Sequence, residues 1–168
     1  MAKWQFDPKY LLQVELAFPN LSIKGYHATS PPDDYYNCIA WAAGDQERFW
    51  SPIPRDQSNG AHDASYGGYW PATALQENTL DAWKSAFALQ GFVECQSAAV
   101  EHGFEKIAIY ADDGSEPQHV ARQLANGKWT SKLGSACDIE HNTLDALEGE
   151  HYGRATCFMK RPRRDTGE

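Results

Sequence analysis

A cysteine and a histidine that lie far apart in the chain are the residues best suited to chemistry. Cys38 follows Asn37 and begins the segment 38–43, which is rich in alanine and ends before Gly44. Asn37 is a good N-cap, so the pattern predicts a buried helix with Cys38 in its first turn. That position lowers the pKa of a thiol and offers free N–H groups to an oxyanion. We therefore expect Cys38 to be a nucleophile; the alternative is a plain core cysteine.

A base for this thiol has to come from elsewhere in the chain. His119 begins the segment 119–124, which is expected to be a strand, whereas three other histidines lie in expected loops: His62, His102 and His151. A histidine on a strand can face a helix packed on the same sheet, which would bring imidazole and thiol together. We expect His119 to be the general base; the alternative is a strand histidine satisfied by the backbone.

The remaining site residues are less sharply defined. By its hairpin position Ser131 could orient the imidazole, but Asp138 is chemically better suited and is preferred. Asn37 could help to form an oxyanion site or could only cap the helix. Trp70, with Trp50 and Tyr69, could wall a substrate groove or pack a long loop onto the core.

The surrounding pattern predicts helices first and an antiparallel sheet afterwards, an α+β layout. Residues 10–18 fit a helix or a strand equally well, and residues 50–71 are irregular because proline and glycine recur there. The clearest helix spans 78–90, capped by Asn78 or Thr79. Strands are expected at 92–95, 105–110, 119–124, 128–133 and 154–160, with a hairpin at Asn126-Gly127. Residues 143–147 suggest a short helical turn.

The length of 168 residues predicts a single domain over 1–168, with its core at about 33–160 and a solvated basic tail at 161–168. The net charge of -8 argues against nucleic acid and membrane surfaces as partners. Without a signal-peptide pattern we expect a cytoplasmic protein, with non-Sec export left open. The four cysteines form no CxxC pair, so we expect free thiols and no metal site. Cys95 and Cys157 are expected to be small buried hydrophobes, and Cys137 is ambiguous.

Two stretches resemble papain-like cysteine hydrolases in their small bacterial forms, the NlpC-type and CHAP-type amidohydrolases. The segment Asn37-Cys38-Ile39-Ala40-Trp41-Ala42 is similar to the nucleophile segment, and residues 119–129 are similar to the histidine strand and its hairpin. Residues 130–134 also resemble uncharacterised bacterial proteins of this shape. The resemblance covers roughly residues 35–45 and 105–141 and departs from the family at the third catalytic residue. It implies a papain-like fold, with N-terminal helices packed on a C-terminal antiparallel sheet.

The expected activity is hydrolysis of an amide, isopeptide or thioester bond in a peptide or peptide-like substrate. Cys38 would attack the acyl carbon, while His119 takes the thiol proton and returns it to the leaving group. No metal or organic cofactor is implied. One alternative is an inactive papain-like domain that binds a protein partner, for example through the aromatic residues of 49–71. Another is a toxin or effector amidase that attacks peptidoglycan or a host protein. A transferase or deamidase would use the same fold.

Overall fold

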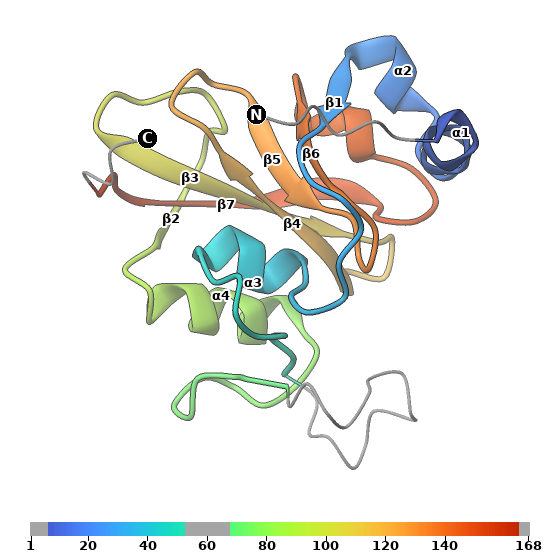
Figure 1. Ribbon diagram of the computed structural model, residues 1–168. Helices are drawn as coiled ribbons and strands as arrows, with labels where there is room; N and C mark the ends of the chain where they lie inside the picture. The colour runs from blue at the N-terminus through green and yellow to red at the C-terminus, as the bar shows by residue number, and fades with distance from the viewer. Residues whose placement is uncertain (1–6, 53–67, 165–168) are drawn as a thin grey trace.

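An antiparallel sheet of seven strands forms the centre of the computed structural model, which describes residues 7–52 and 68–164 (Figure 1). The strand order is β1-β6-β5-β4-β3-β7-β2. The strands are β1 (Tyr26–Ala28), β2 (Val93–Cys95), β3 (Phe104–Ala111), β4 (Pro117–Gln123), β5 (Trp129–Lys132), β6 (Asp138–His141) and β7 (Arg154–Pro162). The helices are α1 (Pro8–Ala17), α2 (Asn20–Lys24), α3 (Cys38–Ala43), α4 (Leu80–Ala88) and the 3-10 helix η2 (Leu144–Leu147). The fold class is therefore α+β.

Helices α3 and α4 lie together against one face of the sheet, here called the α3–α4 face (Figure 1). The sheet contributes Ile107, Ile109 and Val120 to the core on this face. The indoles of Trp50 and Trp70 complete that core, with ring centroids 6.4 Å apart. Burial of this apolar surface fixes the position of α3, because a six-residue helix is too short to be stable without tertiary packing.

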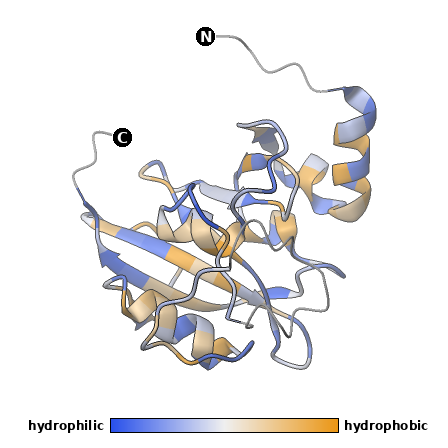
Figure 2. Ribbon diagram, turned by 60° about the horizontal axis from the view of Figure 1, so that its bottom comes forward, coloured by the Kyte–Doolittle hydropathy of each residue, from blue (hydrophilic) through white to orange (hydrophobic). Residues whose placement is uncertain are grey.

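The opposite face, here called the α1–η2 face, packs against α1, α2 and η2. Tyr110, Ala121 and Ile139 belong to the core on this side. Hydrophobic and hydrophilic residues are interspersed along the strands (Figure 2), and several polar side chains are enclosed between the layers. The fully buried ones are His119, Ser131, Lys132 and His141. Buried polar groups need partners, and their pairing defines the candidate site.

Most expected elements are present. Residues 8–17 form a helix, Thr79 caps α4 by accepting from the Ala82 amide at 3.1 Å, and Asn37 caps α3. The hairpin turns at Gly127, whose φ of 88° favours glycine. Strands β1 and β6 were not anticipated, because each spans only three or four residues and their pairing with one another joins distant segments. Among the described residues, no helix has the length and apolar character needed to cross a bilayer.

Three expectations need correction. The basic run does not begin as a solvated tail, because β7 continues to Pro162 and Arg161 is 7% exposed in an ion pair with Glu105. Cys95 and Cys157 are only half-buried, whereas Cys137 is buried. Trp70 belongs to the core and its indole N–H donates to the Leu75 carbonyl at 2.8 Å. The residues 53–67 of the expected irregular segment lie outside the described part of the chain.

Candidate functional site

Cys38 is the first residue of α3, and the start of this helix is tied to the loop that follows it. The Asn37 side-chain oxygen accepts from the Ala40 amide at 3.2 Å and from the Trp50 amide at 3.1 Å, and its nitrogen donates to the Trp50 carbonyl at 2.6 Å. These bonds use both acceptor positions of the Asn37 oxygen and one of the two hydrogens on its nitrogen. Asn37 is therefore a positioning residue for Cys38, and its side-chain N–H group is engaged in holding Trp50.

The Cys38 thiol is directed into the protein. Burial raises the pKa of the Cys38 thiol to about 11, while the backbone N–H of Val120 and the Lys132 ammonium act in the opposite direction. The thiol is therefore protonated at neutral pH. A resting thiolate, which the helix position alone would favour, is disfavoured here because desolvation outweighs the nearby donors.

His119 belongs to a chain of hydrogen bonds inside the α1–η2 face. Its Nε2 lies 2.9 Å from the Ser131 hydroxyl, and that hydroxyl lies 2.8 Å from Nε2 of His141. The Nδ1 of His141 lies 2.9 Å from the carbonyl oxygen of Thr143. We call His119, Ser131, His141 and the Thr143 carbonyl the histidine relay. His119 and Ser131 come from β4 and β5, whereas His141 comes from β6 and Thr143 from the turn after it.

The relay fixes where the protons lie. A carbonyl only accepts, so His141 Nδ1 must carry a proton. Burial lowers the pKa of His141 to about 4 and, aided by the charge of His141, the pKa of His119 well below 6.5, so both rings are neutral. His141 Nε2 then accepts from the Ser131 hydroxyl, which in turn accepts from His119 Nε2–H. The remaining nitrogen, His119 Nδ1, is therefore an unprotonated acceptor, and it has no hydrogen-bond partner in the described structure.

Tyr152 holds the His119 ring in place. The two rings are stacked, with centroids 4.2 Å apart and planes 2° from parallel, and Tyr110 lies on another side at 5.4 Å. The phenol is also within electrostatic reach of the Cys38 sulfur, because burial and the Cys38 charge both raise the pKa of Tyr152. Tyr152 therefore contacts one member of the expected pair and lies near the other. The sequence gives no signal for it, since it lies in the loop before β7.

Cys38 and His119 approach the same part of β4 from opposite faces of the sheet. Helix α3 packs on the Val120 side, whereas His119 packs among Tyr110 and Tyr152. The β4–β5 ladder contains only the pairs Arg122↔Thr130 and Gln123↔Trp129, so it has ended before Val120 is reached. The Cys38 thiol meets β4 at Val120, next to His119 in the chain, where β4 still pairs with β3 but no longer with β5. The described structure contains no hydrogen bond between the thiol and His119 Nδ1.

The two candidates for the third residue have separate roles in the structure. Ser131 hydrogen-bonds to His119, as its hairpin position suggested. Asp138 lies elsewhere: its carboxylate accepts from the Tyr36 hydroxyl at 2.6 Å, and burial raises its pKa. Chemical suitability favoured Asp138, but strand geometry decides the pairing. Ser131 has its side chain on the α1–η2 face, whereas the Asp138 side chain reaches Tyr36, which packs on the α3–α4 face.

Lys132 brings a positive charge close to Cys38. Its ammonium donates to the carbonyl oxygens of Asp33 and Ala136, and burial lowers its pKa. This lysine and the relay partner His141 are the polar residues near the site that the sequence did not single out. Within the described residues, no group of three or more His, Cys, Asp or Glu side chains is placed to hold a metal ion.

One comparison with known proteins covers most of the sheet together with α3 and α4 and leaves out α1 and α2. No curated protein and no solved structure gives a significant match to the chain. A family model described as a domain of unknown function, DUF7689, matches residues 27–160, from β1 to the middle of β7. Because the matched residues make up most of the sequence, the chain belongs to the DUF7689 family.

Proposed function

We propose that the protein is a cysteine hydrolase or acyltransferase of papain-like type, with Cys38 as nucleophile and His119 as general base. One observation carries the proposal: the histidine relay leaves His119 Nδ1 deprotonated, buried and without a partner, beside the strand residue that meets the Cys38 thiol. An unsatisfied buried acceptor costs about 1–3 kcal/mol, and use of this nitrogen as a proton acceptor would explain why it is left without a partner.

The raised pKa of Cys38 determines the form of the mechanism. The thiol loses its proton to His119 Nδ1 as sulfur attacks the acyl carbon, so a thiolate forms only during the attack. Because the two groups approach β4 from opposite faces, this transfer requires the part of β4 that is not paired with β5 to rearrange until the thiol and Nδ1 meet. The tetrahedral intermediate then expels an amine or thiol, which takes the proton from His119. Water, activated by the same imidazole, hydrolyses the acyl-enzyme and regenerates the thiol.

The relay keeps the imidazole ready for both steps. When His119 is protonated, its Nε2–H continues to donate to Ser131, and the orientation of the ring is unchanged. Backbone N–H groups at Cys38 and Ile39 are directed toward the sulfur and are the candidate donors to the oxyanion. These assignments deepen the papain-like resemblance in one respect: a serine–histidine pair takes the place of the usual single polar residue.

A second candidate is a papain-like module that binds a partner without catalysis. Three observations favour it: the raised thiol pKa, the complete burial of His119, and the lack of a hydrogen bond between Cys38 and His119 in the described structure. In this case the relay would serve only to hold β4, β5 and β6 together.

The two candidates differ in how Cys38 reacts with an acyl donor. The purified protein is mixed with 4-nitrophenyl acetate at pH 7.5, and acetylation of each cysteine is followed by peptide mass spectrometry. The hydrolase proposal requires acetyl transfer to Cys38, loss of nitrophenol release in Cys38→Ala, and turnover of the acetyl group by water. The matched control is Cys157→Ala, because burial raises the pKa of that half-buried thiol to the same value, about 11.

Equal and slow acetylation of Cys38 and Cys157 would reject the hydrolase and support the binding module. An acetylation rate of Cys38 that is unchanged in His119→Gln would lead to the same conclusion. Circular dichroism of each variant separates loss of reactivity from loss of folding.

A further inference from the structure

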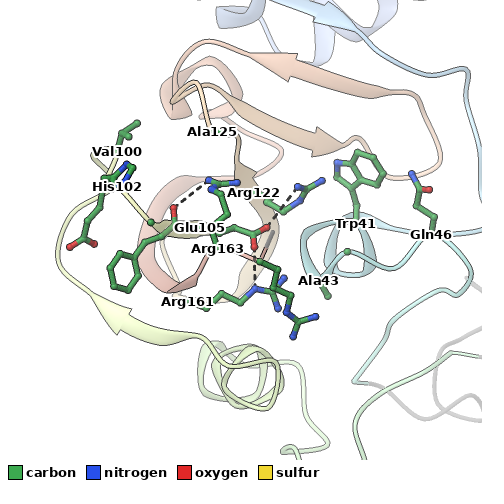
Figure 3. Close-up of a pocket in the computed structure, with 15 residues that line it drawn as sticks. Trp41, Ala43, Gln46, Val100, His102, Glu105, Arg122, Ala125, Arg161 and Arg163 are labelled. Carbon is green, nitrogen blue, oxygen red and sulfur yellow. Dashed lines mark hydrogen bonds and ion pairs between the residues drawn. The ribbon is translucent and has the colours of Figure 1, made fainter. Parts of the chain in front are cut away.

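A groove of about 770 Å³ opens on the α3–α4 face, at the end of α3 that is remote from Cys38. Trp41 and Gln46 lie on one side, and Val100 and His102 lie on the other (Figure 3). The ends of β3, β4 and β7 form the floor between them. Its volume is within the range of pockets that bind small molecules or short peptide segments.

Arginine dominates the charge of this groove. Four arginines line it, against two glutamates: Arg122, Arg161, Arg163 and Arg164, with Glu101 and Glu105. The Glu105 carboxylate lies between two of the guanidinium groups, 3.1 Å from Arg161 Nε and 3.8 Å from Arg122 Nη1 (Figure 3). The two floor arginines therefore share the Glu105 carboxylate.

The second glutamate does not neutralise the rest. Glu101 is engaged by Lys160 at 2.8 Å and by Lys106 at 3.8 Å, and neither lysine lines the groove. Arg163 and Arg164 at the rim therefore make the net charge of the groove more positive. A positive groove on a chain of net charge -8 is a local exception that attracts anions to one place.

The groove lies on the same helix and strand as the candidate nucleophile's surroundings, although Cys38 itself does not line it. Trp41 follows Cys38 by one turn of α3, roughly 5 Å along the axis, and Arg122 follows Val120 by two residues of β4, roughly 7 Å. Trp41 also donates to the Thr130 hydroxyl at 3.0 Å, which fixes this end of the helix on β5. A ligand held by the arginines could therefore extend along α3 toward the Cys38 thiol.

We propose that this arginine groove binds an acidic peptide segment, whose carboxylates pair with the arginines while its backbone extends toward Cys38. Guanidinium groups match carboxylates in bidentate geometry. Trp41 and Val100 offer apolar contacts between the charges, as a side-chain-bearing ligand requires, and the volume exceeds that of a lone inorganic anion. That the peptide is a substrate rests on the proposed function; that it binds does not.

The test measures binding in the Cys38→Ala protein, so that it is independent of catalysis. The probe is an acetylated, amidated hexapeptide with three glutamates, carrying an uncharged dye, and its anisotropy is titrated at 50 mM salt. Its partner probes carry glutamine or phosphoserine at the same positions. We expect the glutamate peptide to bind about 10-fold more tightly than the glutamine peptide and to weaken as salt rises.

The double variant Arg163→Gln/Arg164→Gln should weaken binding of the glutamate peptide about 10-fold. The control is Arg154→Gln, which removes one positive charge, against two in the double variant, from the exposed start of β7, on the order of 30 Å away. It should change binding less than about twofold. Equal affinity for the glutamate and glutamine peptides, or a double variant that binds like the control, would overturn the proposal. Preference for phosphoserine by more than about 10-fold would also overturn it in favour of a phosphate ligand.

Failure of the groove and failure of the hydrolase are distinguishable. If the glutamate peptide binds through the rim arginines but Cys38 is not acetylated by the nitrophenyl ester, the groove remains and the protein is a binding module. If Cys38 is acetylated but the glutamate peptide does not bind, the hydrolase remains and its substrate is not acidic.

Discussion

Cys38 and Cys157 have the same acidity but different surroundings. Both residues lie at the edge of the core on the α3–α4 face, and burial raises the pKa of both thiols to about 11. The Cys38 sulfur is directed into the protein, whereas the Cys157 sulfur lies in an exposed contact with Glu94. The Cys157 sulfur has a lysine and a glutamate nearby, with Glu94 Oε1 at 3.9 Å. The Cys38 sulfur meets the Val120 amide, Lys132 and the electrostatic field of Tyr152, at a position adjacent to an imidazole with a bare nitrogen.

The comparison teaches that thiol pKa alone would not distinguish the proposed nucleophile from the other cysteine. The two thiols are both protonated at neutral pH and differ in the base that lies near them, the His119 imidazole for Cys38 and the Glu94 carboxylate for Cys157. Removing His119, or the groups that orient it, should lower the acetylation rate of Cys38 to that of Cys157. A reagent that needs no base should react with both thiols at similar rates.

The largest effect is expected from His119→Gln, which keeps a polar side chain of similar size but removes the bare imidazole nitrogen. Acetylation of Cys38 by 4-nitrophenyl acetate should fall about 10²–10³-fold, because general-base catalysis is lost. Acetylation of Cys157 in the same sample is the internal control and should not change. A parallel loss of acetylation at both cysteines would indicate a change in folding. Unchanged acetylation at both would contradict a role of His119 as general base.

A smaller effect is expected from Ser131→Ala. The relay is interrupted, so the tautomer of His119 is no longer fixed, and acetylation of Cys38 should fall about 10-fold. Two buried imidazole nitrogens lose a partner, which should lower the free energy of unfolding by about 1–3 kcal/mol in urea denaturation.

Asp138→Asn is the counterpart of Ser131→Ala. It keeps an acceptor for the Tyr36 hydroxyl and does not touch the relay, so acetylation of Cys38 should change less than about twofold. A larger loss in Asp138→Asn than in Ser131→Ala would return the orienting role to Asp138.

The free energy of unfolding should fall both at acid pH, because of the histidines, and at alkaline pH, because of the cysteines. The pKa values of His119 and His141 are lowered in the folded state, so their contribution is complete above about pH 6.5 and is lost as pH falls toward about 4. The thiol pKa values are raised from 9.0 to about 11, so that contribution is complete below pH 9 and is lost as pH rises through 11.

These titrations separate the histidines from the cysteines in thermal unfolding curves. Cys38→Ala and Cys157→Ala should flatten the alkaline loss of Tm to a similar extent and leave the acid side unchanged. His141→Gln should flatten the acid side alone. An alkaline change in only one cysteine variant would show that the pKa is raised at one thiol and not at both.

The smallest difference is expected with iodoacetamide, which reacts with thiolate and needs no general base. At pH 7 the alkylation rates of Cys38 and Cys157 should agree within about threefold and should both rise steeply toward pH 11, as followed by peptide mass spectrometry. Fast alkylation of Cys38 alone at pH 6 would instead indicate a preformed thiolate, the state expected for a thiol exposed at a helix start.

The amino-acid sequence by itself determined the local features. The N-cap at Asn37, the helix that follows it, the glycine turn at 127 and the order of helices before strands were predictable, because capping, turn geometry and periodicity depend on neighbours in the chain. The contact between Ser131 and His119 was predictable for the same reason, since a hairpin places the two residues side by side.

Only the tertiary structure decided which groups meet and at what acidity. His141 joins the relay because β6 pairs with β5, and Tyr152 stacks on His119 because the loop before β7 folds over the α1–η2 face. The thiol pKa of Cys38 is set by burial against β4, which outweighs its position at the helix start. The groove collects arginines from β4 and from β7 together with the two residues that follow it, positions up to 42 residues apart in the chain. Contacts between distant segments carry no local signal, and desolvation depends on everything that surrounds a group.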